Sequence, residues 1–111
     1  MKLSYEDHGA ITVLTISGEL TADQADAFRR SLADRFNAGA RDVILNIEHL
    51  SLLDSAGMEL LLWLLDEVGE HGGQVRLVKP DDLVRKILEL TRLDRRFDIH
   101  ATVESAGKSL R

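Results

Sequence analysis

The sequence predicts a single α/β domain in which an N-terminal β-hairpin precedes a mostly parallel sheet, with elements in the order β-β-α-β-α-β-α-β-α. Segments of strand periodicity alternate with segments of helical periodicity, which is typical of crossover units. One central segment is apolar without interruption, as in a strand covered by helices on both faces. The 111 residues contain one proline and no internal repeat, so one domain spanning residues 1–111 is expected.

The N-terminal part predicts two strands and a helix. Apolar residues alternate over residues 3–5 and 11–16, and His8-Gly9 between them indicates the tight turn of a hairpin. Thr21 is the expected N-cap of the following helix, which ends at residues 37–39. The apolar residues that recur at helical spacing in this helix are Ala25, Phe28, Leu32 and Phe36.

The rest of the chain predicts three strands and three helices. The uninterrupted apolar run begins at Asp42 and has the length of a strand. The further elements are expected in this order: a helix over residues 55–71, a strand within 72–80, a helix over 81–93, a short strand over 97–101 and a terminal helix over 103–110. In the helix over 81–93, the side chains expected to face the core are Leu83, Val84, Ile87 and Leu90.

Composition narrows the possible classes of function. The chain has no cysteine, which excludes disulfides, thiolate metal sites and thiol catalysis. The formal net charge is -5, and the arginines between residues 92 and 96 have Asp94 and Asp98 among them, so we expect a solvated face and no nucleic-acid partner. The N-terminus has no apolar signal core. Because the longest apolar run, residues 60–65, is far shorter than the roughly 18 residues of a membrane span, we expect a cytoplasmic protein without membrane insertion.

Asp54 and Ser55 stand between the buried strand and the helix that follows it. In open α/β sheets the carboxyl ends of the strands are the usual position of functional residues. The simplest interpretation is structural, because Asp and Ser both accept backbone N–H groups as helix N-caps. The functional alternatives are a nucleophilic Ser55, a phosphoacceptor Asp54, and a Ser55 that another enzyme phosphorylates.

The first two alternatives have little support. A nucleophile elbow needs glycine two residues before and two residues after the serine, and Gly57 matches this pattern but Leu53 does not. The four histidines are scattered, so no spacing places a general base on Ser55. A phosphoacceptor Asp54 of the receiver type would need an acidic pair for Mg²⁺ after the first strand, and that strand leads into a hairpin. No dinucleotide or Walker A motif is present, and we expect no enzymatic activity, cofactor or metal site.

Phosphorylation of Ser55 by a kinase fits the pattern better. A hydroxyl at a helix N-terminus lies where backbone N–H groups and the helix dipole tolerate a phosphate. The phosphate adds about -1.5 to -2 charges, next to Asp54 and one turn from Glu59. A partner that fits the uncharged surface would then be repelled, so phosphorylation could switch binding without unfolding the domain.

Several segments of the chain resemble the STAS domain, specifically the bacterial anti-sigma factor antagonists. Residues 14–20 (LTISGEL) resemble the family's second strand and its Gly-Glu-Leu turn. Residues 42–57 (DVILNIEHLSLLDSAG) resemble the signature segment, which carries Asp-Ser-x-Gly at residues 54–57. Residues 72–80 and 84–106 resemble the later strand, helix and terminal strand. The tetrapeptide alone is a weak signal, but in this order and spacing the combination is strong.

The resemblance implies a STAS-type fold and a partner-switching mechanism. In that family the unphosphorylated antagonist binds an anti-sigma factor, which is also a GHKL-type serine kinase, and so releases the sigma factor. The kinase phosphorylates the serine after the motif aspartate, here Ser55, with Asp54 and Gly57 supporting the site. Phosphorylation breaks the complex, and a serine phosphatase restores it. The antagonist itself catalyses nothing.

The resemblance also implies partner contacts around Ser55. Glu19, Thr21 and Asp23 follow the second strand and are expected contacts, although family members commonly carry Asp where Thr21 stands. Glu59 is a further expected contact. Here Met58-Glu59 replace the Leu-Gly that often follows the motif glycine, and Glu59 adds negative charge next to the proposed phosphorylation site.

The helix after Ser55 also indicates an anchor for a partner at Trp63. The inward stripe expected from a helical wheel contains Met58, Leu61, Leu62, Leu65 and Val68. Trp63 falls among the acidic residues of the opposite face, four residues from both Glu59 and Glu67. Since exposed tryptophan is typical of interface hot spots, we expect Trp63 to contact the partner. The alternative is that it packs under another segment or is simply one exposed apolar side chain. The sequence leaves open a monomer or a weak homodimer, and exposure of both Leu60 and Trp63 would favour weak self-association.

Two other functions remain open from the sequence. One is a STAS scaffold or sensor that is never phosphorylated and works within a larger signalling assembly. The other is a soluble STAS accessory subunit of a lipid transporter, which would co-purify with an ATPase subunit. Ser55 favours the switched antagonist, because a mere scaffold would not need a phosphate acceptor.

Overall fold

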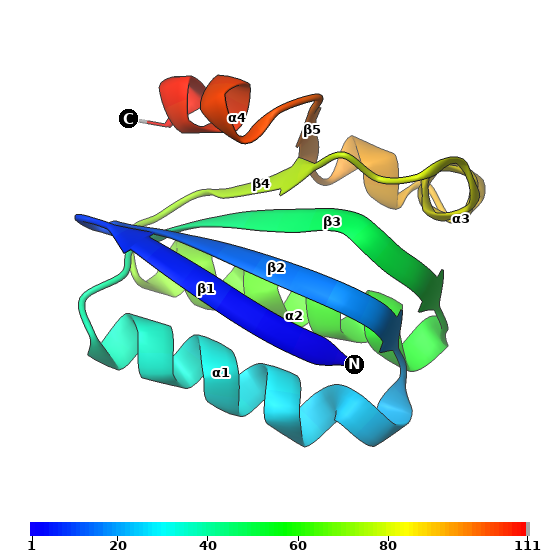
Figure 1. Cartoon of the computed structure of the whole chain (residues 1–111), viewed down its shortest axis with the longest axis horizontal. Helices are drawn as coiled ribbons and strands as arrows, with labels where there is room; N and C mark the ends of the chain where they lie inside the picture. Colours follow the sequence, from blue (N-terminus) through cyan, green and yellow to red (C-terminus); the bar gives the residue numbers. More distant parts are fainter. Residues whose placement is uncertain (111) are drawn as a thin grey trace.

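The computed structural model describes residues 1–110 and confirms the expected order of elements (Figure 1). The strands are β1 (Lys2–His8), β2 (Ile11–Leu20), β3 (Asp42–Leu53), β4 (Val75–Val78) and β5 (Asp98–His100). The helices are α1 (Ala25–Asn37), α2 (Ser55–Glu70), α3 (Asp82–Leu90) and α4 (Val103–Ser109). Two short 3-10 turns, η1 (Ala22–Gln24) and η2 (Leu93–Arg95), precede α1 and β5.

The strands form one sheet in the order β1-β2-β3-β4-β5. β1 and β2 are antiparallel and are joined by a turn after the pair His8 and Ile11, in which Gly9 adopts a φ of 62°. The other neighbouring strands are parallel, so the predicted hairpin and mostly parallel sheet are confirmed. Parallel strands end at the same edge, and Leu20 at the end of β2 is paired with Leu53 at the end of β3. This pairing brings the turn after β2 next to the start of α2.

The sheet separates two apolar clusters. Figure 1 shows α1 and α2 along one face of the sheet and α4 on the other. The larger cluster includes the fully buried Leu14, Ile16, Phe28, Leu32, Leu45, Leu61 and Leu64. The smaller cluster contains Ile44, Val78 and Ala106 and joins β3 and β4 to α4. Residues 42–45 of β3 are all buried, as predicted for a central strand covered on both faces.

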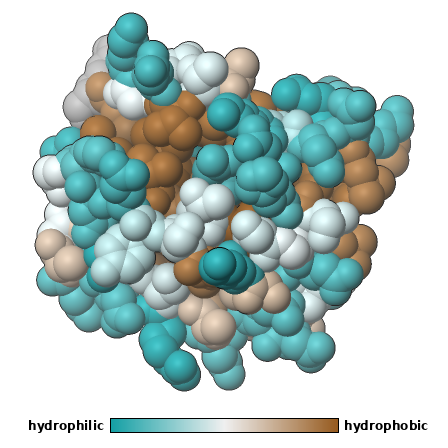
Figure 2. All heavy atoms as spheres, viewed as in Figure 1, coloured by the Kyte–Doolittle hydropathy of each residue, from teal (hydrophilic) through white to brown (hydrophobic). Residues whose placement is uncertain are grey.

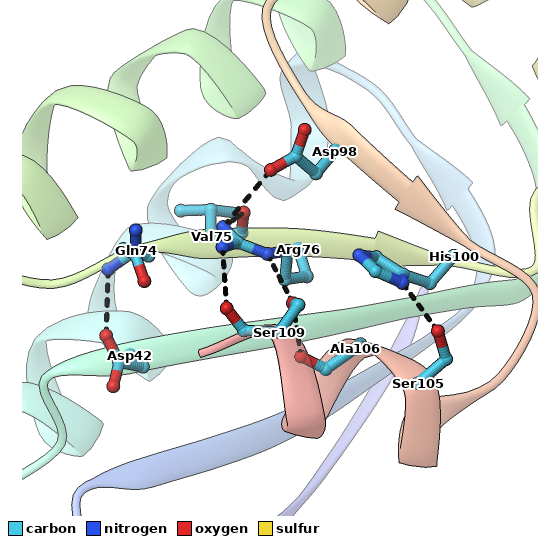
Figure 3. A network of polar contacts seen from close by, with 9 residues as sticks. All are labelled: Asp42, Gln74, Val75, Arg76, Asp98, His100, Ser105, Ala106 and Ser109. Carbon is cyan, nitrogen blue, oxygen red and sulfur yellow. Dashed lines mark hydrogen bonds and ion pairs between the residues drawn. The ribbon is translucent and has the colours of Figure 1, made fainter. Parts of the chain in front are cut away.

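Polar contacts hold α4 to the sheet (Figure 3). Arg76 on β4 is buried; its Nε donates to Ser109 Oγ at 2.7 Å and its Nη1 donates to the Val75 carbonyl at 2.9 Å. Nη1 also lies 3.6 Å from Asp98 Oδ2 on β5. The guanidinium therefore links the last two strands to the last helix, and each of its contacts offsets part of the cost of burying a charge.

Helix α3 exposes two leucines that were expected to face the core. Leu83 is 53% exposed and Leu90 is 72% exposed, so the prediction was wrong for both. Val84 is buried as predicted, Ile87 is half-buried, and Leu88 is the second buried residue of the helix. The reason is that α3 is short and lies beside β3 (Figure 1), so one narrow i, i+4 stripe reaches the core. Figure 2 shows apolar surface on the side of the molecule where α3 lies.

Candidate functional site

Asp54 caps helix α2. Its backbone is extended, and its Oδ1 accepts a hydrogen bond from the Gly57 N–H at 2.8 Å. Its carbonyl accepts from the Met58 N–H at 2.9 Å, which is the first intrahelical bond. The structural interpretation of the Asp-Ser pair therefore holds for Asp54, whose carboxylate satisfies one of the free N–H groups of the first turn.

Because Asp54 is the cap, Ser55 is the first residue of α2 itself. Its side chain is exposed, and its hydroxyl makes no hydrogen bond to any other group within residues 1–110. An accessible, unengaged hydroxyl at the positive end of a sixteen-residue helix can receive a phosphate without breaking a contact of the fold.

Gly57 allows the first turn of α2 to lie against the end of β2. A Cβ at this position would collide with the Leu20 carbonyl oxygen and would lie 2.8 Å from Leu53 Cδ1. Any other residue would therefore push α2 away from β2. The glycine of Asp-Ser-x-Gly thus fixes the distance between Ser55 and the turn that follows β2.

The end of β2 and the turn that follows it carry three of the predicted contact residues. Glu19 is exposed at the end of β2, and Asp23 is exposed in η1. Thr21 is half-buried; its Oγ1 donates to Gln24 Oε1 at 2.6 Å, and it caps η1 and not α1, which begins three residues later than expected from that cap. The Leu20 carbonyl accepts from the Asp54 N–H at 3.5 Å, which is a long contact that joins this turn directly to the start of α2.

Glu59 lies one turn after Ser55 on α2 and is exposed. The carboxyl edge of the sheet therefore presents Ser55 together with three exposed acidic groups: Glu19 at the end of β2, Asp23 in η1 and Glu59 on α2. A phosphate on Ser55 would add to an already negative surface.

Trp63 is less exposed than expected, and its contact with a partner stays a prediction. Its side chain is half-buried and packs against the core. The indole ring stands edge-on to Phe28 of α1, with ring centroids 6.4 Å apart and an interplanar angle of 67°. The Arg29 guanidinium lies 5.7 Å from the centre of the same ring. Trp63 thus fills the contact between α1 and α2, as the alternative interpretation held.

The same contact explains why α2 has a wider apolar face than expected. Leu60 and Leu64, which the helical wheel left out of the inward stripe, are 1% and 0% exposed. Leu61 and Val68 are buried as predicted. Because the sheet covers one face of α2 and α1 covers the adjoining face, α2 buries two neighbouring stripes of side chains. Since Leu60 and Trp63 are not both exposed, the condition for self-association through these residues is not met.

Within residues 1–110, no group of three or more His, Asp or Glu side chains is arranged to hold a metal ion. In the same part of the chain, no helix is both long enough and apolar enough to cross a membrane.

The comparison with known families decides the classification of this fold and site. A model of the STAS domain matches residues 2–106, which includes every strand and the whole of α2. The chain belongs to the STAS domain family. The predicted resemblance and the STAS-type fold are therefore confirmed.

Relatives of this STAS domain share most of its length. A Thermotoga maritima protein with a proposed anti-sigma factor antagonist role is 28% identical over 102 residues, which cover 91% of this chain and 90% of that protein. The structure of the anti-sigma factor antagonist SpoIIAA in its unphosphorylated form matches with a TM-score of 0.80 and 26% identity, over 95% of this chain and 92% of that one. The phosphorylated form of SpoIIAA from Bacillus matches with a TM-score of 0.74 and 26% identity, over 96% and 97%.

Proposed function

We propose that this chain is an anti-sigma factor antagonist whose binding is switched by phosphorylation of Ser55. In its unphosphorylated state it binds an anti-sigma factor that is also a GHKL-type serine kinase, and the sigma factor is released. The kinase transfers phosphate to Ser55, the complex dissociates, and a serine phosphatase regenerates the binding form. The antagonist supplies the acceptor serine and a docking surface and has no catalytic role of its own.

The observation that carries this proposal is the state of the Ser55 hydroxyl. The hydroxyl is exposed, and Ser55 is the first residue of a long helix. Because Asp54 is the N-cap of that helix, the Ser55 hydroxyl is not used for capping. Among the relatives, SpoIIAA has been solved in both an unphosphorylated and a phosphorylated form, which supports a covalent switch in this family.

The electrostatics favour release of the partner after phosphorylation. The phosphate brings about -1.5 to -2 charges to an edge that already carries Glu19, Asp23 and Glu59 on its surface. A partner that fits closely around the uncharged Ser55 hydroxyl has no room for the phosphate, and any partner carboxylate opposite Ser55 would be repelled by it, since like charges placed opposite each other cost several kcal/mol. The fold itself is little affected, because negative charge at a helix N-terminus is favourable.

The docking surface that we propose consists of Glu19, Thr21, Asp23, Ser55 and Glu59. These residues lie on two segments that the Leu20–Asp54 contact joins. We do not include Trp63 in this surface, because its ring packs against Phe28. Trp63 supports this surface only indirectly, because it packs between α1 and α2.

The proposal is tested with the anti-sigma factor kinases encoded in the same genome. Their affinities for wild type, Ser55→Ala and Ser55→Glu are measured by titration calorimetry, with Ser4→Glu on β1, outside the proposed docking surface, as a matched control for an added charge. One kinase should bind wild type, Ser55→Ala and Ser4→Glu equally. Ser55→Glu should bind it about 100-fold more weakly, because a like-charge contact costs several kcal/mol.

With ATP, the same kinase should phosphorylate wild type and leave Ser55→Ala unmodified. Circular dichroism of Ser55→Glu should show an unchanged fold, so that a loss of affinity reports the charge and not unfolding. Equal affinity of the kinase for Ser55→Glu and wild type, or phosphate transfer to another residue, would contradict the proposal.

A further inference from the structure

A second candidate site lies at the opposite end of α2 from Ser55. It is a cavity of about 290 Å³, open to solvent, at the amino ends of the last two strands. Its lining comes from the C-terminal turns of α2, the α2–β4 turn, the starts of β4 and β5, and η2. Gly69 of this lining is fourteen residues beyond Ser55, which corresponds to about 20 Å along the helix. The cavity is therefore separate from the proposed phosphorylation site.

The cavity is positively charged, in a chain whose net charge is -5. Arg95 and Arg96 line it, both are exposed, and neither forms an ion pair within the described residues 1–110. Asp98 is the one carboxylate among the lining residues. That carboxylate lies 3.6 Å from the guanidinium of Arg76, which also lines the cavity and is held by Ser109 (Figure 3). Arg76 and Asp98 offset each other, and Arg95 and Arg96 leave the cavity with two uncompensated positive charges.

The carbonyl groups at the C-terminal end of α2 do little to offset this positive charge, because they already accept hydrogen bonds. The Glu67 and Gly69 carbonyls accept from the N–H groups of His71 and Gly72, and the Val68 carbonyl accepts from the Gly73 N–H at 2.9 Å. The negative end of the helix dipole is thus largely satisfied by the turn itself.

Gly69 supplies an independent observation, because nothing in the chain requires glycine there. It lies inside α2, its φ is not positive, and an added Cβ would meet no atom within 4 Å. Glycine in a helix costs about 0.5–1 kcal/mol relative to alanine. By contrast, Gly73 also lines the cavity, but its Cβ would collide with the Arg41 carbonyl oxygen. The missing side chain at Gly69 keeps this wall of the cavity open.

We propose that this cavity binds a small organic anion that carries a phosphate group or several carboxylates. A guanidinium matches such groups with paired, charge-assisted N–H···O bonds, and two guanidinium groups on neighbouring residues fit a doubly charged ligand. The cavity lies at the lower end of the range for ligand pockets, roughly 300–1,000 Å³. The ligand is therefore about the size of a single sugar phosphate or a tricarboxylate.

The test is a titration of the isotope-labelled full chain with pyrophosphate and with citrate, followed by amide NMR shifts at constant ionic strength. We expect saturable shifts at residues 69, 73–76 and 95–98 and none at Ser55. Arg95→Ala and Arg96→Ala should each weaken binding about tenfold or more, as expected when a charge-assisted hydrogen bond is removed. Arg92→Ala is the matched control, since Arg92 is exposed but does not line the cavity, and it should bind like wild type.

Gly69→Glu keeps the test decisive, because it places a carboxylate in the cavity at a position where a side chain has room. This variant should remain folded and lose binding, whereas Gly69→Ala should retain it. Shifts that do not saturate, or that depend equally on Arg92, would show only a diffuse ion atmosphere and would overturn the proposal. The titration needs no partner protein, so its result is independent of the proposed function at Ser55.

Discussion

At the scale of single residues, two glycines of the same helix meet opposite requirements. Gly57 has no room for a side chain, because its Cβ would collide with the Leu20 carbonyl, whereas Gly69 faces open space. The difference decides what the same substitution does at the two positions.

Gly57→Ala should therefore lower the free energy of unfolding by about 2 kcal/mol or more, the cost of overpacking a rigid contact. Gly69→Ala should raise it by up to about 1 kcal/mol, because alanine is the better helix former and meets no obstacle. Urea denaturation of the two variants beside wild type measures both changes. A Gly57→Ala variant as stable as wild type would show that α2 can move away from β2 at no cost.

Asp54 stabilises the start of α2 as its N-cap. Asp54→Ala removes the acceptor for the Gly57 N–H and should lower the free energy of unfolding by about 1 kcal/mol, a typical value for a lost N-cap. Asp54→Asn keeps an oxygen in the same position, so its free energy of unfolding should fall by much less than that of Asp54→Ala. Thermal unfolding followed by circular dichroism distinguishes the two, and equal losses in both variants would mean that the negative charge matters more than the hydrogen bond.

Thr12 on β2 carries a buried hydroxyl without a partner. Its side chain is fully buried, and Oγ1 has no hydrogen bond within the described chain. Thr12→Val replaces it with a side chain of the same shape, so stability should rise by about 1 kcal/mol or more. The half-buried Thr15 offers the control, because Thr15→Val should change stability by less than about 0.5 kcal/mol. Chemical denaturation of both variants gives the comparison, and a destabilised Thr12→Val would imply a bound water at the hydroxyl.

At the scale of elements, the α1–α2 contact shows what periodicity can and cannot predict. Helical spacing identified the residues of α2 that share one face, and Leu61 and Val68 are buried as predicted. It could not tell that α1 covers the adjoining face, because that depends on the crossover of α1 and not on the sequence of α2. The burial of Leu60, Trp63 and Leu64 was underestimated for this reason.

Trp63→Ala should therefore act on stability and not on partner recognition. Removing a half-buried indole should cost about 2 kcal/mol, less than the roughly 3–5 kcal/mol for a fully buried aromatic residue. Trp63→Phe should retain most of the contact with Phe28. Denaturation by urea measures the loss, and calorimetry with the partner checks that the affinity of the folded variant is unchanged. A large loss of affinity with no loss of stability would restore Trp63 as an interface anchor.

At the same scale, α3 shows the converse error. Four apolar residues of this helix were expected to face inward, but a short helix beside β3 buries only one stripe, and Leu83 and Leu90 remain outside. Here too the pattern was read correctly as helical, and the missing information was how much of the helix the sheet covers.

At the scale of the whole molecule, the order of elements was enough to predict a hairpin and a mostly parallel sheet. Strands joined by helices run parallel, and parallel strands end at one edge, so residues 19–23 and 54–57 meet there. The region around Ser55 could therefore be predicted from the chain alone. The cavity around Arg95 and Arg96 could not, because it depends on the packing of α2, η2 and β5 in space, and in the sequence those arginines resemble a solvated cluster.

The central claim is that Ser55 is the residue that receives phosphate in the cell. The most direct test is intact-mass measurement and phosphosite mapping of the protein purified from its native cells in several growth conditions. The account predicts a chain with a single phosphate on Ser55 in at least one condition, and none on the exposed Ser51 that precedes it on β3. Unmodified Ser55 in every condition, or phosphate on Ser51 in its place, would contradict it.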